Sequence, residues 1–206
     1  MRFLGLIVDQ HLCWDSHVDH VVKRINSGLF CLRQLTYLCN QQTLITVYHA
    51  HIQSHISYGL CVYGATSNKN LNKILVLQKQ GIRIILNLPM NQSVKEHFQK
   101  LSIFTVYGLY IFQCIIYVKE SKTLGILQLR THSYNTRGNS LVVPDHHKLS
   151  FFSKKTTYSG MKLYRCLPSH IKEIEDYQKF KNALKSFLIE LAPYGLDDFY
   201  SYNRNR

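Results

Sequence analysis

The spacing of apolar residues along the chain predicts a mostly α-helical protein. Downstream of Ser16, apolar side chains recur every three or four positions, which is the period of one buried face of a helix. The members of this stripe, which we expect in the core, are Val18, Val21, Val22, Ile25, Leu29 and Leu32. The same period predicts further helices over about 41–63, 68–88, 93–100, 105–121 and 158–166, and another after Asp176.

Local signals predict how the first elements begin. Ser16, with Asp19 three residues on, has the pattern of a capping box at the start of a helix. Asn40 can cap the next helix, and Gly64 can end it. Upstream of all helices, the apolar run over 3–8 is predicted to form one short strand at the edge of a sheet.

The helical period is lost over 123–157, where Gly, Pro, Ser, Asn and Thr become frequent. Such a change of composition is typical of a boundary between subdomains. The expected organisation is an edge strand over 1–9, a helical bundle over 10–122, an extended basic linker over 123–157 and a small C-terminal α-rich part over 158–206.

The charge balance favours a polyanionic partner. The chain carries 25 Lys and Arg against 12 Asp and Glu, a formal net charge of +13. Residues 67–160 hold 13 of these cations and 3 of the acids, a net charge of +10. Nucleic acid is the simplest partner for such a patch, and an anionic membrane surface is the competing interpretation.

The cysteines and the apolar runs of the sequence bear on the cell compartment in which the protein is expected. Six cysteines occur without any C-x-x-C pair, and several lie in apolar helical patterns where a free thiol acts as a small hydrophobe. No secretory signal and no run near the ~18 apolar residues of a membrane span is present. We therefore expect an intracellular protein of the cytoplasm or nucleus, with reduced thiols and no membrane partner.

One helix carries cations on a single side. At about 100° per residue, Lys69, Lys73 and Arg83 fall on one face of the helix over 68–88, with Lys79 at its margin. Lys69 with Lys73, and Lys79 with Arg83, are pairs four residues apart that could follow a phosphate backbone. The alternative is the solvated face of a core helix.

A second candidate lies in the basic linker, over 130–139. It combines the guanidinium groups of Arg130 and Arg137 with His132 and Tyr134. Arginine can bind a phosphate through two hydrogen bonds, and tyrosine can stack on a base. The alternative is an ordered loop that bonds its own backbone through Ser, Thr and Asn side chains.

No other cluster predicts chemistry. His51 and His55 have a zinc-chelating spacing and His49 is nearby, but no further ligand follows at a suitable distance, so no metal site is predicted. No nucleophile, phosphate-binding glycine loop or small-molecule site stands out. Trp14 is expected to anchor the first helix in the core, with an exposed, base-stacking position as the alternative.

Five ordered segments together carry a family resemblance. They are Phe3-Leu4-Gly5-Leu6-Ile7-Val8-Asp9, then Ile56-Ser57-Tyr58-Gly59 with Val62-Tyr63-Gly64, Leu77-Gln78-Lys79 with Ile82-Arg83-Ile84-Ile85, His132-Ser133-Tyr134-Asn135-Thr136-Arg137, and Lys162-Leu163-Tyr164 through Leu167-Pro168 to Leu196-Asp197-Asp198-Phe199. In this order they resemble the region after the catalytic palm in reverse transcriptases of Jockey-like non-LTR retrotransposons. The resemblance implies a helical thumb-like bundle that binds RNA, RNA–DNA hybrid or DNA.

The same resemblance implies that catalysis lies elsewhere. The family's polymerases hold two Mg²⁺ ions on a Phe- or Tyr-Ala-Asp-Asp turn and an earlier Asp, and this sequence has no such turn. Its only Asp-Asp pair, Asp197-Asp198, is expected to be a solvated helix cap. We therefore expect a C-terminal fragment that is inactive alone, has no cofactor of its own and is partnered by an upstream palm domain. The alternative is a helical protein-interaction module retained from a decayed element.

Overall fold

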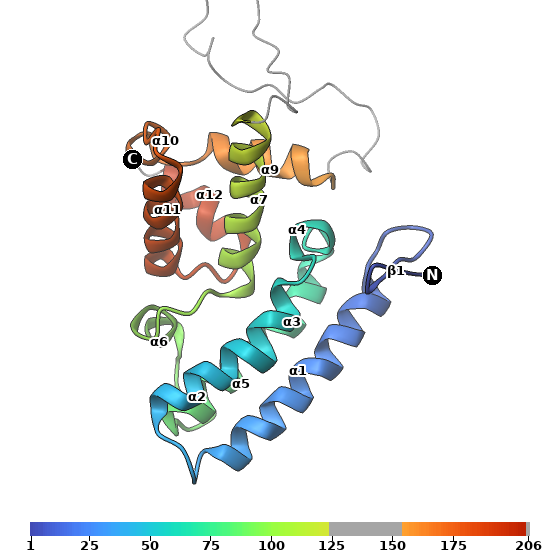
Figure 1. The fold of residues 1–206 in the computed structure, drawn as a ribbon, viewed down its shortest axis with the longest axis vertical. Coiled ribbons are helices and arrows are strands. Elements are labelled where there is room, and N and C mark those ends of the chain that lie inside the picture. Colours follow the sequence, from blue (N-terminus) through green and yellow to red (C-terminus); the bar gives the residue numbers. More distant parts are fainter. Residues whose placement is uncertain (124–153, 205–206) are drawn as a thin grey trace, which may run out of the picture.

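The protein is mostly α-helical, as the apolar spacing predicts, and a short two-stranded hairpin lies at its N-terminus (Figure 1). The computed structural model describes residues 1–123 and 154–204. The elements of the first range are β1 (Arg2–Phe3), β2 (Leu6–Ile7), α1 (Asp15–Leu35), α2 (Gln41–Tyr48), the π-helical turn η1 (His49–Gln53), α3 (Ser54–Ser57), α4 (Leu60–Tyr63), α5 (Asn68–Leu86), α6 (Lys95–Lys100) and α7 (Val106–Thr123). Those of the second are α9 (Thr156–Arg165), α10 (Ser169–Lys172), α11 (Tyr177–Leu191) and α12 (Leu196–Arg204). Most of the linker expected over 123–157 lies outside the described residues.

The apolar run over 3–8 is a hairpin rather than one strand. β1 pairs antiparallel with β2, with Phe3 opposite Leu6. The chain turns at Leu4 and Gly5, whose φ angles are 44° and 80°. Glycine adopts such angles readily, so Gly5 permits a turn that the alternation of apolar residues does not reveal.

The start of α1 also differs from its sequence pattern, because the capping box of Ser16 and Asp19 does not form. The helix begins at Asp15, and Trp14 precedes it in a left-handed conformation without a side-chain cap. The Asp9 carboxylate holds this turn by accepting the N–H groups of Cys13 at 2.9 Å, Trp14 at 2.7 Å and His11 at 3.0 Å. Trp14 is only 6% exposed, which confirms it as a core anchor.

The long helix expected over 41–63 is interrupted. Asn40 caps its start as predicted, accepting the N–H of Thr43 at 2.9 Å. The helix then widens into η1 and breaks after α3, where Gly59 adopts a φ of 68°. Gln113 of α7 bridges the break, accepting the N–H of Cys61 at 3.1 Å and donating to the Ser57 carbonyl at 3.0 Å. Backbone groups freed by the break thus regain partners.

Three helical segments, α1, α2 to α3, and α5, pack side by side as the N-terminal bundle. Gly28 of α1 makes part of this packing possible, because a Cβ there would lie 2.7 Å from the carbonyl oxygen of His51 in η1. Of the stripe predicted as core in α1, all members are buried except Val22, which is half-buried. The helical period therefore identified the buried face of α1.

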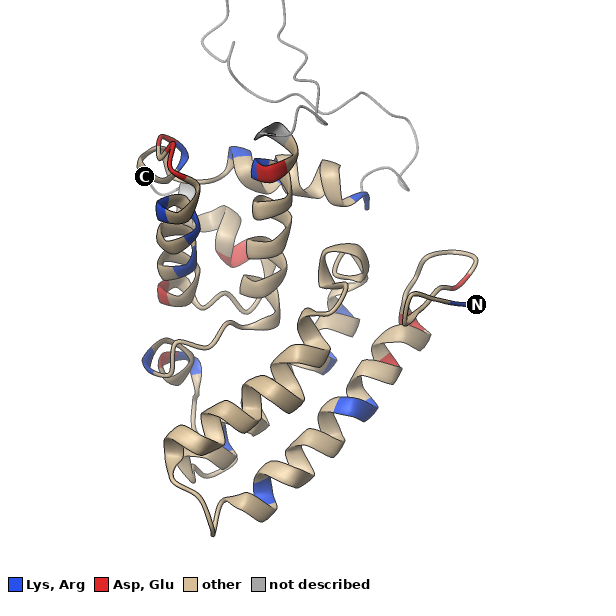
Figure 2. Cartoon of the chain, viewed as in Figure 1, with Lys and Arg blue, Asp and Glu red and all other residues tan. Residues whose placement is uncertain are grey.

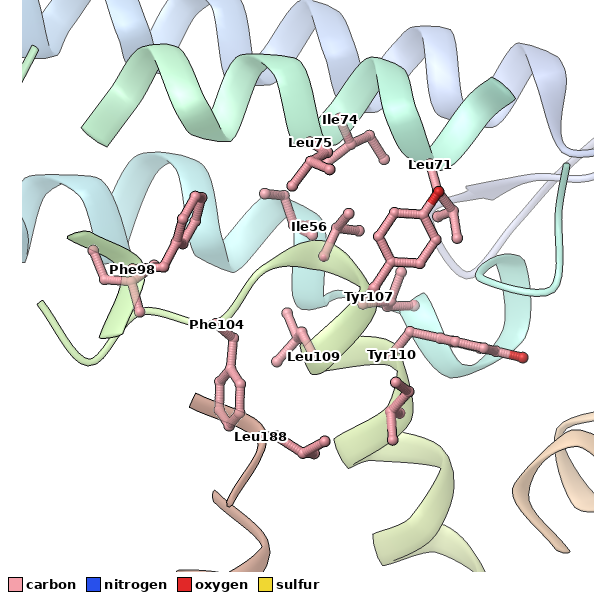
Figure 3. Packing of buried hydrophobic residues seen from close by; sticks show 14 of the residues in the cluster. Ile56, Leu71, Ile74, Leu75, Phe98, Phe104, Tyr107, Leu109, Tyr110 and Leu188 are labelled. Carbon is pink, nitrogen blue, oxygen red and sulfur yellow. The ribbon is translucent and has the colours of Figure 1, made fainter. Parts of the chain in front are cut away.

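A second group of helices, α7, α9, α11 and α12, lies above the bundle in Figure 1. Helix α7 belongs to both groups, since it packs against α3, α4 and α5 as well as α9 and α11. Figure 3 shows Tyr107 and Tyr110 of α7 beside Leu71 of α5. One hydrophobic core therefore runs from Trp14 to Phe199.

We expect Leu29→Ala to lower the free energy of unfolding by roughly 2–5 kcal/mol, because Leu29 is 1% exposed and its truncation leaves a cavity. The neighbouring Phe30 is 62% exposed and provides the matched control. Phe30→Ala should change stability by less than about 0.5 kcal/mol. Urea unfolding of the three proteins checks this, and equal midpoints for Leu29→Ala and the parent would contradict the packing.

Asp9 gives the fold an acid-sensitive element. The backbone donors of Cys13, Trp14 and His11, with Cys13 the strongest, hold the pKa of Asp9 below its usual 3.8. A depressed pKa contributes stability that is present above the unfolded value and is lost as the pH falls through the folded value. Asp9→Asn should therefore lower the urea midpoint at pH 7, and its difference from the parent should shrink below about pH 3.8. A difference that is the same at pH 7 and pH 3 would show that the charge of Asp9 is unimportant.

Candidate nucleic-acid interface

Helix α5 carries the four cations that the sequence predicts as a binding face. Its apolar side is buried, with Leu71, Ile74 and Ile82 almost completely inaccessible. The cations therefore lie on its remaining circumference, where α1 flanks one part and the C-terminal loop before α12 approaches another. The four side chains have different surroundings, and each has to be considered separately.

The two cations nearest the start of α5 remain accessible. Lys69 is exposed. Lys73 forms an ion pair with Asp19 of α1 at 2.9 Å, and the two side chains are 39% and 56% exposed. An ion pair this exposed contributes little to stability. Lys73 is thus held in place by Asp19 while its ammonium group stays in contact with solvent.

The two cations further along α5 are used within the protein. The Lys79 ammonium lies 4.0 Å from the centre of the Tyr194 ring, which follows α11. Burial, helped by Arg83, lowers the pKa of Lys79, and burial raises the pKa of Tyr194 to about 12. Arg83 donates through Nη2 to the Gln92 carbonyl at 2.9 Å. These two side chains hold the C-terminal loop and the turn before α6.

The second predicted cluster, Arg130, His132, Tyr134 and Arg137, lies outside the described residues. Within α5, Lys69 is exposed and Lys73, Lys79 and Arg83 are each half-buried. Lys79 and Arg83 differ from Lys69 and Lys73 in that they contact Tyr194 and the Gln92 carbonyl. The helical wheel does not distinguish Lys69 and Lys73 from Lys79 and Arg83. The contacts with Tyr194 and Gln92 depend on the fold, since Tyr194 is far away in the sequence and Gln92 lies in the bend before α6.

Charge is segregated around α1 in a way that the sequence did not reveal. Residues 1–66 are almost neutral by composition, yet each of their three acids has a bonding partner within the protein. Asp9 binds the backbone, Asp15 accepts from Asn70 at 2.6 Å, and Asp19 binds Lys73. Asp15 and Asp19 both face α5. Figure 2 shows the acids near the start of α1 and only cations further along it.

The opposite flank of α1 carries cations and histidines. His20 and Arg24 lie there. Burial first, and then the charges of Arg24, His51 and His20, lowers the pKa of His55 of α3. Burial first, and then Arg2, Arg24 and Lys23, lowers the pKa of His20. We name His20, Arg24, His51 and His55 the histidine face. The sequence analysis considered His51 and His55 only as metal ligands and did not single out His20, because the proximity of Arg24 to His55 depends on how the helices pack.

No group of three or more His, Cys, Asp or Glu side chains among the described residues is arranged to hold a metal ion. No helix in the described part is long and apolar enough to cross a bilayer.

Asp198 accepts the N–H of Tyr194 at 2.8 Å and, with Asp197, lies in the first turn of α12, where carboxylates are favoured.

Comparison with known proteins finds two relatives in Drosophila melanogaster. The chain is 24% identical over 98 residues, 46% of its length, to the RNA-directed DNA polymerase from mobile element jockey. It is 27% identical over 94 residues, 43% of its length, to the probable RNA-directed DNA polymerase from transposon BS. The matched stretches amount to 11% and 10% of those relatives. No protein-family model and no solved structure matches the chain.

These similarities confirm the resemblance to Jockey-like non-LTR reverse transcriptases that the ordered motifs indicate. They support the interpretation that the chain corresponds to part of such a protein. The chain covers only a small fraction of the relatives' length, so the activity of the whole relatives is a separate matter from what this part does.

Proposed function

We propose that this chain is the nucleic-acid-binding, post-palm part of a reverse transcriptase-like protein, and that it binds template–primer duplex through its phosphates. Contacts of this kind fix position and orientation without reading bases. The polymerase carboxylates and their Mg²⁺ ions belong, in this proposal, to a palm domain of the intact protein. The isolated chain then binds RNA–DNA hybrid, RNA or DNA and does not polymerise.

The observation that supports this proposal most directly is the uncompensated positive charge of the surface. Between described residues the structure has two ion pairs, Lys73 with Asp19 and the looser Lys100 with Glu96 at 4.0 Å. Figure 2 shows cations on α1, α5 and α11, with acids at the start of α1 and the end of α11. A surface whose cations are not neutralised internally attracts a polyanion.

Within that surface, Lys69 and Lys73 are the proposed phosphate contacts of α5. They are one helical turn apart, a rise of about 6 Å, and both remain accessible. Asp19 holds Lys73 until a phosphate replaces it. Arg130, His132, Tyr134 and Arg137 are proposed as additional contacts, whereas Lys79 and Arg83 contribute through the structure that they hold. A nucleic-acid partner is consistent with action in the cytoplasm or nucleus.

A protein-interaction module is the second candidate, and exposed apolar residues favour it. Tyr37, in the loop after α1, is 92% exposed, and Met90, after α5, is 70% exposed. Both line a shallow cavity of about 460 Å³ together with Arg33 and Ile84. Exposed apolar side chains of this kind can bind a protein partner. The salt dependence of binding separates the two candidates.

We expect Lys69→Gln/Lys73→Gln to weaken binding to RNA–DNA hybrid alike for all sequences. If each ammonium meets one phosphate, the slope of log affinity against log salt should fall by about 2. Fluorescence anisotropy over a salt series provides the measurement. Lys100→Gln/Lys179→Gln removes the same charge from exposed positions elsewhere and should change the slope less.

Asp19→Asn gives an independent check of the same contact. It releases Lys73 from its ion pair without removing a cation, so binding to hybrid should tighten. The proposal is contradicted if the Lys69→Gln/Lys73→Gln protein binds hybrid as tightly as the parent at every salt concentration. The protein-interaction candidate is then preferred.

A further inference from the structure

We propose that the histidine face is a second phosphate-binding surface, on the flank of α1 away from Lys73, which binds nucleic acid more tightly as the pH falls. The inference rests on the proposed function and extends it, because it adds a proton-linked contact that the resemblance to reverse transcriptases does not supply. Its members, His20, Arg24, His51 and His55, come from two antiparallel helical segments.

Packing at Gly28 sets the geometry of this face. The absent side chain lets η1 approach α1 so closely that a Cβ would lie 2.7 Å from the His51 carbonyl oxygen. The two segments run in opposite directions from this point. Arg24 lies about one turn before Gly28 and His55 about one turn after His51, so Arg24 and His55 are brought level. His20 follows one further turn along α1.

The groups around the two half-buried histidines are cationic or imidazole. Burial first, and then the charges of Arg2 of the hairpin and of Arg24 and Lys23 of α1, lowers the pKa of His20. Burial is also the largest cause that lowers the pKa of His55, followed by Arg24, His51 and His20. His17 also lies beside His20, but it is buried and its ring accepts the N–H of Ile7 at 3.3 Å. Among the described residues, no carboxylate is one of the charged groups that shift the pKa values of His20 and His55, and Asp15 and Asp19 contact α5 instead.

As far as the described residues go, this environment contains no anion, and it is unsuited to a metal ion. Zinc binds neutral imidazoles, and neighbouring guanidinium and ammonium groups would repel the cation. The same groups match a phosphodiester, which accepts hydrogen bonds from arginine and from protonated imidazole. A nucleic-acid backbone is favoured over an isolated anion because Arg2 and Lys23 extend the positive charge along α1.

The linkage between binding and protons has a definite sign. Burial and like charges lower the pKa values of His20 and His55, so both are mainly neutral at pH 7.5 in the free protein. A bound phosphate favours the protonated rings and raises these pKa values. Binding therefore takes up protons, and affinity must rise as the pH falls through the range between the free and bound values.

The decisive measurement is the affinity for RNA–DNA hybrid at pH 7.5 and pH 5.5 and constant ionic strength, by anisotropy with a pH-insensitive dye. We expect the parent to bind roughly tenfold more tightly at pH 5.5, equivalent to about one proton taken up over one pH unit. His20→Gln/His55→Gln should lose most of this increase. His11→Gln/His170→Gln, which removes two exposed histidines elsewhere, should retain it.

Each outcome decides a different point. If His20→Gln/His55→Gln keeps the full increase, the histidine face is not the proton-linked site, although the proposed function stands. If the parent binds hybrid at neither pH, the proposed function fails as well. If an acidic polyglutamate peptide shows the same affinity and the same increase, nucleic acid is the wrong partner. Circular dichroism establishes that each variant is folded.

A second variant tests the geometry without relying on binding. Arg24→Gln removes the cation shared by both histidines, so the imidazole titrations of His20 and His55 in the free protein should move to higher pH. Proton NMR follows both rings. At the same time, Arg24→Gln should weaken hybrid binding at pH 5.5. Unchanged titration midpoints would overturn the proposed arrangement of the face.

Discussion

The buried side chain of Gln78 is the interaction on which the joining of the two helical groups depends. Its amide nitrogen donates to the Tyr48 hydroxyl and to the Phe104 carbonyl, both at 3.1 Å, and its carbonyl oxygen accepts the N–H of Val106 at 2.7 Å. The first N–H of α7 is therefore capped by α5. Replacing Gln78 by an apolar residue would leave buried groups without partners, at a cost of about 1–3 kcal/mol each.

Because α7 is fixed in this way, the second helical group is placed relative to the first. Thr105, beside Val106, donates to the Pro193 carbonyl at 2.6 Å and so ties the loop before α12 to the start of α7. That loop carries Tyr194 over Lys79. A buried amide in α5 thus decides indirectly that Tyr194 contacts Lys79 towards one end of the basic helix, whereas Lys69 near the other end is exposed.

The sequence was most informative where a property is local. The stripe from Val18 to Leu32 identified a buried helix face, and Asn40 marked the start of a helix, because both depend on residues a few positions apart. The sequence was less informative where contacts from outside the local pattern decide the structure. Helix α1 begins without the expected Ser16 cap, after a turn that Asp9 holds by binding three backbone donors. The break at Gly59 is tolerated because Gln113, over fifty residues away, satisfies the freed groups.

The same distinction explains the candidate site. Net charge and spacing found the cations of α5, but accessibility depends on Asp19, Gln92 and Tyr194, which only the fold brings near. The histidine face shows the reverse case, since a nearly neutral stretch of sequence acquires a positive flank. Asp15 and Asp19 are engaged on the side of α1 that faces α5, whereas Arg24 and the histidines lie on the two segments that approach each other closely at Gly28. Electrostatic potential is therefore a property of how charges are paired in space, and composition alone bounds only its total.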